Sequence, residues 1–345
     1  MKLLSISVPS YNSEAYLERC LESLLVGGER VEIIVVDDGS TDRTGEIADR
    51  YAERYPTIVK VVHQKNSGHG EGVNKGLFLS TGLYYKVVDS DDMLDKEGYL
   101  ALLEKLEHLY LLGSLPDLVI ADFIYERNDG KKKSHYVSSF GDYFPEERII
   151  GWEKVKGMHF HHLLLMHALY YKRDVLVNSQ TILPLHCFYV DDIFAYKPLP
   201  YCNSIYYVPR IVYRYQIGRD DQSVNQKNFV KRYPMLCTIM DNIYGAYSLD
   251  DIYRMPKGLK KYMLHTIGTL NLTALFAICG GSDNYIERKK TFRRYFVSLK
   301  NKDKRMYRKV KYGSYYSLIC WMPYLLRRKV IIGGYKMTKK IAKVG

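Results

Sequence analysis

The sequence has few cysteines and no closely spaced pair of them. Its six cysteines are spread over 345 residues, and no two form a CxxC pair. This spacing excludes the usual disulfide framework and the usual structural zinc site. We therefore expect a protein of a reducing, cytoplasmic compartment.

Long apolar runs are also scarce. The N-terminal segment MKLLSISVPSYN has a short apolar run that stops at Pro9, too early for a secretory signal, and we interpret it as a strand. The longest uncharged window, residues 262–282, has the length of a membrane span but contains His265, Asn271 and three threonines. We expect a helix buried inside the protein there.

Acidic residues are rare near the C-terminus. Residues 285–345 contain 19 Lys and Arg but only two acids, a net charge of +17 in a chain whose total is +13. Within this basic tail, residues 312–326 are uncharged, aromatic and shorter than the ~20 residues needed to cross a bilayer. The pattern favours binding to an anionic membrane surface. A solvated basic helix packed on its own domain is the alternative, and nucleic-acid binding is a third, without a recognised motif.

What the sequence does have is a globular composition, 47% hydrophobic and 26% charged, with alternating elements. Short apolar segments typical of strands alternate with segments of helical periodicity. The strands are expected at 3–9, 31–36, 58–63 and 83–88, and the helices at 14–26, 43–55 and after the Gly-rich loop 66–72. This order predicts an α/β fold with a Rossmann-like, mostly parallel sheet flanked by helices. A further strand is expected at 116–125, a hairpin tip at 129–133, and a helical extension beyond 225.

Three polar segments follow predicted strands: PSYN at 9–12, DDGS at 37–40 and DSDD at 89–92. Because ligands of such sheets bind beyond the carboxyl ends of the strands, we expect these segments to meet at one site. The crowded acids Asp89, Asp91 and Asp92 need a compensating partner, and Mg²⁺ or Mn²⁺ suits carboxylate ligands. Taken alone, the cluster favours solvated carboxylates that cap a helix, and its position after a strand is what indicates a metal site.

Four ordered motifs carry a resemblance to a known family. The segments SVPSYNSEAYLERCLESLL, IIVVDDGSTDRTGEIADRY, NSGHGEGVNKGL and VVDSDDML resemble the nucleotide-binding half of the family 2 glycosyltransferases with a GT-A fold. The resemblance is close over about the first 110 residues and looser up to residue 225. It implies an enzyme that transfers a sugar from a nucleotide diphosphate to an acceptor hydroxyl, with inversion and with a divalent metal.

The resemblance also implies roles for the nucleotide-binding residues. Pro9 and Tyr11 would border the nucleobase, and Asp38 would accept its ring N–H, while Asp37 supports the turn. Asn74 is placed in the nucleotide site as well. The family often has an arginine before this asparagine, whereas this chain has Val73. Other cations that could replace the arginine are Lys65, His69 and Lys75.

In the acidic motif, the resemblance places Asp89 at the ribose and the metal, and Asp91 at the metal, Mn²⁺ or Mg²⁺. Asp92 is expected to cap a helix or to support the metal ligands without binding the metal itself. The catalytic base is expected in HCFYVDDIFAYKPL, with Asp192 as first choice and Asp191 as second. An N-cap for the following helix is the alternative for this pair.

Downstream, YRYQIGRDDQSV resembles the loop that closes over the donor. The implied phosphate contacts are Arg214, Arg219 and Gln222.

Other chemistries find little support. GxSxG is absent, which argues against a nucleophile-elbow hydrolase. The segment HFHHLLLMH, residues 159–167, has four histidines that do not share one helical face, and HExxH is absent. We interpret them as acceptor-site or core histidines rather than a metal site.

The sequence thus predicts a GT-A domain at 1–225, composed of a nucleotide-binding half, 1–112, and an acceptor half, 113–225. A helical extension at 226–284 and a basic amphipathic tail at 285–345 follow. The hypothesis is a glycosyltransferase of cell-envelope polysaccharide synthesis, peripheral at the inner face of the membrane, with a UDP-sugar donor and a glycan or lipid-linked acceptor. A homodimer through the helical half is left open. The alternatives are a catalytically impaired GT-A binding protein, a receiver-type signalling module and a basic nucleic-acid-binding protein.

Overall fold

The computed structural model describes residues 1–128, 133–159, 162–218, 226–281, 284–313, 315–319 and 321–342. The chain forms two compact units. The first comprises Met1–Lys156 and Leu164–Arg219, and the second comprises Gly157–Leu163 and Asp220–Gly345. The predicted boundary at residue 225 lies outside the described residues. The predicted extension and basic tail both belong to the second unit.

Within the described residues, the first unit has one ten-stranded sheet in the order β3-β2-β1-β4-β9-β6-β10-β5, with β7 and β8 attached to β6 and β10. The first four strands of this path are parallel to one another. They are β1 (Leu4–Ser10), β2 (Val31–Asp37), β3 (Val59–His63) and β4 (Tyr84–Val87). Every residue of β1, β2 and β4 is buried, because helices cover both faces of a parallel sheet. The predicted α/β fold and the first four strands are confirmed.

The other half of the sheet mixes directions, which the sequence did not reveal. β9 (Leu169–Lys172) runs antiparallel between β4 and β6 (Leu118–Asn128), and β10 (Ile205–Ile217) runs parallel to β6. Three short strands pair antiparallel at the edges: β5 (Met93–Leu94), β7 (Lys133–Ser138) and β8 (Ile149–Ile150). β6 and β7 form the predicted hairpin, whose tip lies outside the described residues.

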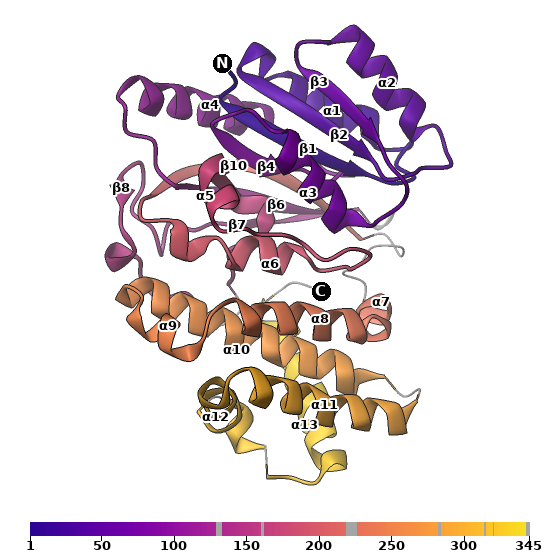
Figure 1. Ribbon diagram of the computed structural model, residues 1–345, viewed down its shortest axis with the longest axis vertical. Helices are drawn as coiled ribbons and strands as arrows, with labels where there is room; N and C mark the ends of the chain where they lie inside the picture. The colour runs from indigo at the N-terminus through magenta and orange to yellow at the C-terminus, as the bar shows by residue number, and fades with distance from the viewer. Residues whose placement is uncertain are drawn as a thin grey trace. The chain divides into compact units, whose positions relative to one another are not determined.

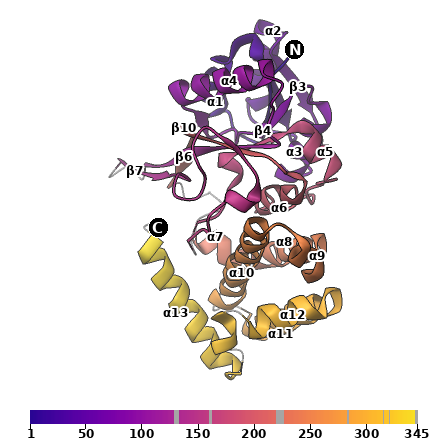
Figure 2. The same ribbon diagram turned by 90° about the vertical axis from the view of Figure 1, so that its left-hand side faces the viewer.

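Helices cover both faces of this sheet (Figures 1 and 2). Figure 2 shows α1 (Leu17–Leu25) and α4 (Lys96–Leu111) on one face, and α3 (His69–Leu79), α5 (Arg173–Asn178) and α6 (Asp191–Tyr196) on the other. α2 (Thr44–Arg54) packs beside α1, where the Tyr51 hydroxyl donates to Glu22 Oε1 at 2.6 Å. Short 3₁₀ turns lie at η1 (Gly28–Arg30), η2 (Trp152–Lys154), η3 (Met166–Ala168) and η4 (Leu199–Tyr201).

The second unit is helical, as predicted (Figure 1, orange to yellow). Its described elements are α7 (Gln226–Lys231), α8 (Tyr233–Ala246), α9 (Leu249–Arg254), α10 (Lys257–Gly280), α11 (Tyr285–Lys302), α12 (Lys304–Tyr312), η5 (Tyr315–Leu318) and α13 (Tyr324–Ala342). α10 is central and contacts α8, α11 and α13. Its buried Asn271 accepts hydrogen bonds from the hydroxyls of Tyr244 and Tyr295, at 3.0 and 2.9 Å.

Among the described residues, α10 is the one helix that could cross a membrane by length and composition. However, 61% of its apolar stretch is buried inside the protein, which agrees with the expected buried helix. The basic tail contributes to that packing. Arg288 donates to the carbonyl of Ala277 at 2.9 Å, and Arg328 donates to that of Cys279 at 2.7 Å, so these cations satisfy the C-terminal carbonyls of α10.

Candidate active site

The ends of the parallel strands bring the predicted polar segments together. Ser10 and Asp37 are register partners at the ends of β1 and β2. The Asp38 N–H donates to the Ser10 carbonyl at 2.8 Å, which joins PSYN to DDGS. Tyr11 is 51% exposed and therefore accessible to a ligand, whereas Pro9 is buried against Gly72 of α3.

Asp38 holds the Gly-rich loop. Its carboxylate is 4% exposed and accepts hydrogen bonds from the Gln64 side chain and from the backbone N–H groups of Ser67 and Gly68, at 2.7–2.8 Å. Oδ1 accepts two of these bonds and Oδ2 accepts one. One lone pair of Oδ2 is left for a nucleobase N–H, so the predicted contact stays a prediction.

The Gly-rich loop in turn holds the segment that leads to the predicted base. The Asn74 side chain exchanges two hydrogen bonds with the backbone of Leu183, at 2.9 and 3.0 Å. A Cβ at Gly70 would lie 2.5 Å from the Pro184 carbonyl oxygen, so only glycine permits this approach. Val73 is buried, with 2% of its surface exposed. Thus Asn74 positions a loop, and its contact with the nucleotide stays a prediction.

The acidic motif follows β4, at the same edge of the sheet. Asp89 Oδ1 lies 2.8 Å from His69 Nε2, at the start of α3. Asp92 is fully buried, and it accepts the Tyr213 hydroxyl at 2.7 Å and the Gln216 N–H at 2.8 Å. Asp92 therefore fastens the motif to β10 and does not cap the next helix. That cap is Asp95, which accepts the Gly98 N–H at the start of α4.

The acids of the motif repel one another in a partly buried environment. Burial, followed by the charges of Asp91 and Asp89, raises the pKa of Asp92 well above its usual value. Burial would also raise the pKa of Asp89, but the hydrogen bond and charge of His69 lower it. Burial opposes a charged His69, yet its hydrogen bond to Asp89 raises the pKa of this imidazole. Of the three cations considered as replacements for the missing arginine, His69 is therefore the one bonded to the acidic motif.

The sequence analysis did not identify one buried lysine near the site. Lys86 of β4 is fully buried, and its Nζ donates to the carbonyls of Met166 and His167 at 2.7 and 2.6 Å. The same Nζ lies 4.6 Å from the centre of the Tyr170 ring and 4.9 Å from that of Tyr213. A lone lysine inside an otherwise apolar strand was the signal that could have identified it.

His167, in the turn η3, faces the acidic motif. Its Nε2 lies 4.0 Å from Asp89 Oδ2, and its ring stacks on Tyr215 with 4.2 Å between ring centres. Burial lowers the pKa of His167 to about 3, so the ring is neutral at neutral pH. Of the four histidines at 159–167, His159 and His162 belong to the second unit. His161 lies outside the described residues.

The two candidates for the catalytic base, Asp191 and Asp192, are the first two residues of α6. Burial, then the charge of Asp89, raises the pKa of Asp191, and the charge of His69 opposes this shift. The pKa of Asp192 is raised well above its usual value by burial and by Asp191 alone. Asp191 is therefore the member of the pair that interacts electrostatically with the acidic motif.

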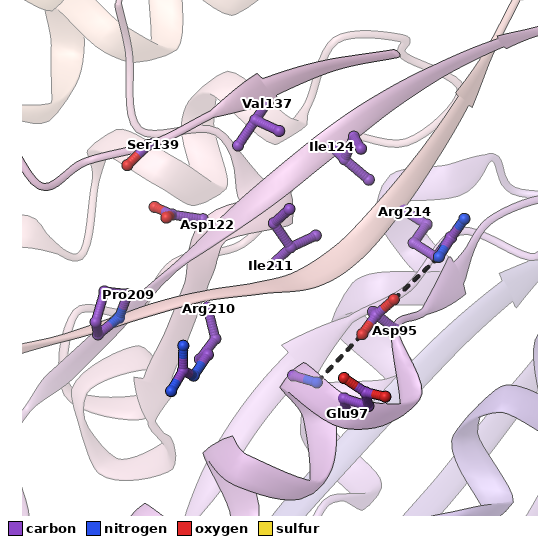
Figure 3. Close-up of a pocket in the computed structure, with 11 residues that line it drawn as sticks. Asp95, Glu97, Asp122, Ile124, Val137, Ser139, Pro209, Arg210, Ile211 and Arg214 are labelled. Atoms are coloured by element: carbon purple, nitrogen blue, oxygen red, sulfur yellow. Dashed lines mark hydrogen bonds and ion pairs between the residues drawn. The ribbon is translucent and has the colours of Figure 1, made fainter. Parts of the chain in front are cut away.

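The Arg214 side chain lies on the face of β10 opposite to that of Tyr213, because adjacent residues of a strand point to opposite faces. Its guanidinium pairs with Asp95 at 3.0 Å and with Glu126. There it lines a cavity of about 770 Å³ together with Asp122 and Arg210 (Figure 3). Its predicted phosphate contact would require release from both carboxylates. Arg219 and Gln222 lie outside the described residues.

Comparisons with known proteins agree with this architecture. Residues 5–172 match the family model described as Glycosyl transferase family 2. The chain is 31% identical to EpsH of Bacillus subtilis (strain 168) over 222 residues, which are 62% of this chain and 60% of EpsH. It is 36% identical to the glycosyltransferase GlyG of Streptococcus pneumoniae over 132 residues, 37% of this chain and 42% of GlyG. The chain thus spans at most 60% of the length of these curated relatives.

The fold is shared with a solved structure. TarS 1–349 of S. aureus, solved in complex with UDP-GlcNAc, matches with a TM-score of 0.65 and 18% identity, covering 98% of this chain and 92% of that one. The protein therefore has a GT-A fold with a helical C-terminal region. Its residues 5–172, slightly less than half of the chain, match the family 2 glycosyltransferases, in agreement with the resemblance that the motifs carry.

Proposed function

We propose that this protein is an inverting, metal-dependent glycosyltransferase that moves a sugar from a UDP-sugar to a hydroxyl group of a glycan or a lipid-linked saccharide. The observation that carries the proposal is the convergence of side chains from four separate segments. Asp89 lies between His69 and His167, and the charge of Asp191 acts on both Asp89 and His69.

The acidic motif fits a divalent cation. Among the described residues, ligand atoms of Asp89, Asp92 and His167 all lie within 4.8 Å of one another. The resemblance adds Asp91, which is next to Asp92 in sequence and two residues before the start of β5. Such an ion would relieve the repulsion between the acids and, when bound, stabilise the charge of the diphosphate leaving group.

The chain's own residues would position the reactants. Tyr11 would stack on the nucleobase, Asp89 would accept a ribose hydroxyl, and the cation His69 would lie beside the diphosphate. Single-displacement inversion needs a carboxylate that removes the proton of the attacking hydroxyl. We place Asp191 first for this role and Asp192 second, because the charges of Asp89 and His69 act on Asp191.

Ligand-induced thermal stabilisation tests the proposal. UDP with Mn²⁺ should raise the melting temperature of the protein, because a ligand that binds the folded state stabilises it by mass action. The Asp91→Ala variant should lose this rise. Asp142→Ala, which changes an exposed acid far along the chain, is the matched control and should keep it.

Two results would count against the proposal. If no nucleoside diphosphate or UDP-sugar stabilises the protein, the GT-A domain does not bind a donor. If UDP-sugars bind but are neither hydrolysed nor transferred to any acceptor, the protein is the catalytically impaired binding protein, which the buried Val73 in place of the family's arginine would explain.

The site of action is part of the same proposal. We place the protein in the cytoplasm at the inner face of the membrane, in cell-envelope polysaccharide synthesis. The support is the basic tail and its exposed apolar side chains: Leu318 is 67% exposed, Trp321 is 74% exposed and Leu325 is 59% exposed. Apolar side chains among cationic ones suit the interface of an anionic bilayer.

A further inference from the structure

We propose that His167 is a nitrogen ligand of the divalent cation held by the acidic motif, which makes the centre a mixed carboxylate and imidazole site that prefers Mn²⁺ to Mg²⁺. The inference rests on the proposed function, since it concerns the cation of that site. The sequence motif supplies only carboxylates, whereas His167 comes from η3, which directly precedes β9 and is far from the motif in sequence.

The distances suit a shared ion. Two ligand atoms about 2.2 Å from one cation lie roughly 3 to 4.4 Å apart, depending on the angle between them. His167 Nε2 and Asp89 Oδ2 are 4.0 Å apart, too far for a hydrogen bond but within this range. Asp92 supplies the third ligand atom of the group, within 4.8 Å of the other two, so a bound ion would draw these atoms together by up to about 0.4 Å.

The nitrogen of His167 that faces the acidic motif is Nε2. The residue is 5% exposed, and its Nε2 lies 4.0 Å from Asp89 Oδ2. A neutral imidazole carries its proton on one nitrogen only, so with the proton on Nδ1 the lone pair of Nε2 points toward the carboxylates. A cation between them would accept this lone pair and the carboxylate oxygens together.

The surroundings fix both the direction and the charge of the ring. The rings of Tyr213 and Tyr215 lie 4.7 and 4.2 Å from the imidazole, measured between ring centres, and the Phe123 ring lies at 5.6 Å. Lys86 holds the His167 carbonyl at 2.6 Å, which sets the position of the turn. A neutral imidazole held toward two carboxylates has a free lone pair, the form in which histidine binds metals.

The ligand set also predicts selectivity. Mg²⁺ strongly prefers oxygen ligands, whereas imidazole nitrogen binds transition metals better. A site in which an imidazole joins the carboxylates of the acidic motif should therefore favour Mn²⁺. Without His167, the remaining carboxylates would discriminate less between the two ions.

Pulsed electron paramagnetic resonance of bound Mn²⁺ tests the ligand directly, without reference to activity. The whole protein with Mn²⁺ and UDP should show modulation from a directly bound ¹⁴N nucleus. Histidine-selective ¹⁵N labelling of the unchanged protein should convert this modulation to that of ¹⁵N. His167→Phe, which keeps an aromatic ring in the stack, should abolish it and weaken Mn²⁺ binding at least about tenfold.

His69→Phe is the matched control, because it removes the other imidazole beside Asp89. It should leave the nitrogen modulation in place. The inference is overturned if Mn²⁺ binds without nitrogen modulation in the unchanged protein, or if the modulation survives His167→Phe and disappears in His69→Phe. These results leave the proposed transferase intact. If Mn²⁺ does not bind at all, both the inference and the proposed metal dependence fail, whereas UDP binding still reports on the donor site.

Discussion

Asp191 and Asp192 are neighbours in sequence but differ in the charges that surround them. Both have raised pKa values because of burial. Only the pKa of Asp191 is also changed by the charges of Asp89 and His69, two groups of the proposed donor site. A general base works best with a pKa near the operating pH, and burial beside another acid moves a carboxylate in that direction.

The first prediction concerns this pair. Asp191→Asn should lower kcat for sugar transfer by about 10²–10⁴-fold, the usual contribution of a general base. Asp192→Asn, the matched change one residue away, should have a smaller effect, with KM for the donor unchanged in both variants. The measurement is steady-state kinetics with a UDP-sugar donor; a larger loss in Asp192→Asn would return Asp192 to first place.

The pH profile of the same reaction gives the second prediction. A base must be deprotonated to act, so kcat/KM should rise with pH through the raised pKa of Asp191. The acidic limb of the kcat/KM profile should therefore have its midpoint at a pH above the ordinary aspartate pKa of about 3.9. The residual activity of Asp191→Asn should lack this limb. An unchanged limb in that variant would assign the titration to another group.

At the scale of elements, the site depends on contacts that join one segment to the next. Lys86 links β4 to η3, and Asp92 links the acidic motif to β10. The Gly-rich loop packs against residues 183–187, which precede Asp191. Substitutions that remove these contacts should therefore change the geometry of the site, although the substituted residues do not themselves bind a ligand.

Lys86→Met gives the third prediction. The change removes a buried charge but leaves the carbonyls of Met166 and His167 without their donor. We expect the free energy of unfolding to fall by about 2 kcal/mol. The reason is that two buried carbonyls without a hydrogen bond destabilise the folded state more than burial of the methionine side chain stabilises it. Lys96→Met, at an exposed position in the first turn of α4, should change it little. Urea unfolding of both variants provides the comparison, and equal stability would show that Lys86 is dispensable for the turn.

Gly70→Ala gives the fourth prediction. A methyl group there would lie 2.5 Å from the Pro184 carbonyl oxygen and push the 183–187 segment away from α3. Displacement of the segment that leads to Asp191 should lower kcat at least about tenfold, because catalysis is sensitive to small misplacements. Gly268→Ala also replaces a helical glycine, but nothing lies within 4 Å of its added methyl group, so activity should persist. Full activity in Gly70→Ala would show that this contact does not position the base.

At the scale of the whole molecule, the charge of the second unit is the feature to explain. Some of it has a structural role, since Arg288 and Arg328 donate to carbonyls at the end of α10. Lys304, Arg308 and Lys309 are exposed and remain accessible to an anionic surface.

Tryptophan fluorescence gives the fifth prediction. The chain has two tryptophans, Trp152, which is 2% exposed, and Trp321, which is 74% exposed. Vesicles that contain phosphatidylglycerol should shift the emission to shorter wavelength as Trp321 enters the interface, and added salt should reduce the shift. Trp321→Phe should abolish it, while Trp152 provides a constant internal reference. An equal shift with neutral phosphatidylcholine would exclude charge as the cause, and a salt-sensitive shift with duplex DNA alone would favour nucleic-acid binding.

The sequence by itself determined the parallel half of the fold and the location of the site. Short apolar runs such as residues 31–36 are typical of strands buried on both faces, and the polar segments after parallel strands lie at one edge of the sheet. For this reason Pro9, Asp38 and Asp89 could be expected at one edge of the sheet, whereas Asp192 and Asp191 were predicted from the family resemblance alone.

Only the tertiary structure decided which partner each side chain has. The antiparallel β9, a four-residue strand, carries no signal of its pairing, yet the turn before it places His167 at Asp89. Period-two alternation along β10 directs Tyr213 to Asp92 and Arg214 to Asp95, a choice that needs the register of the strand. Local patterns fix elements because they depend on neighbours in sequence, whereas contacts between distant segments depend on how the sheet aligns them.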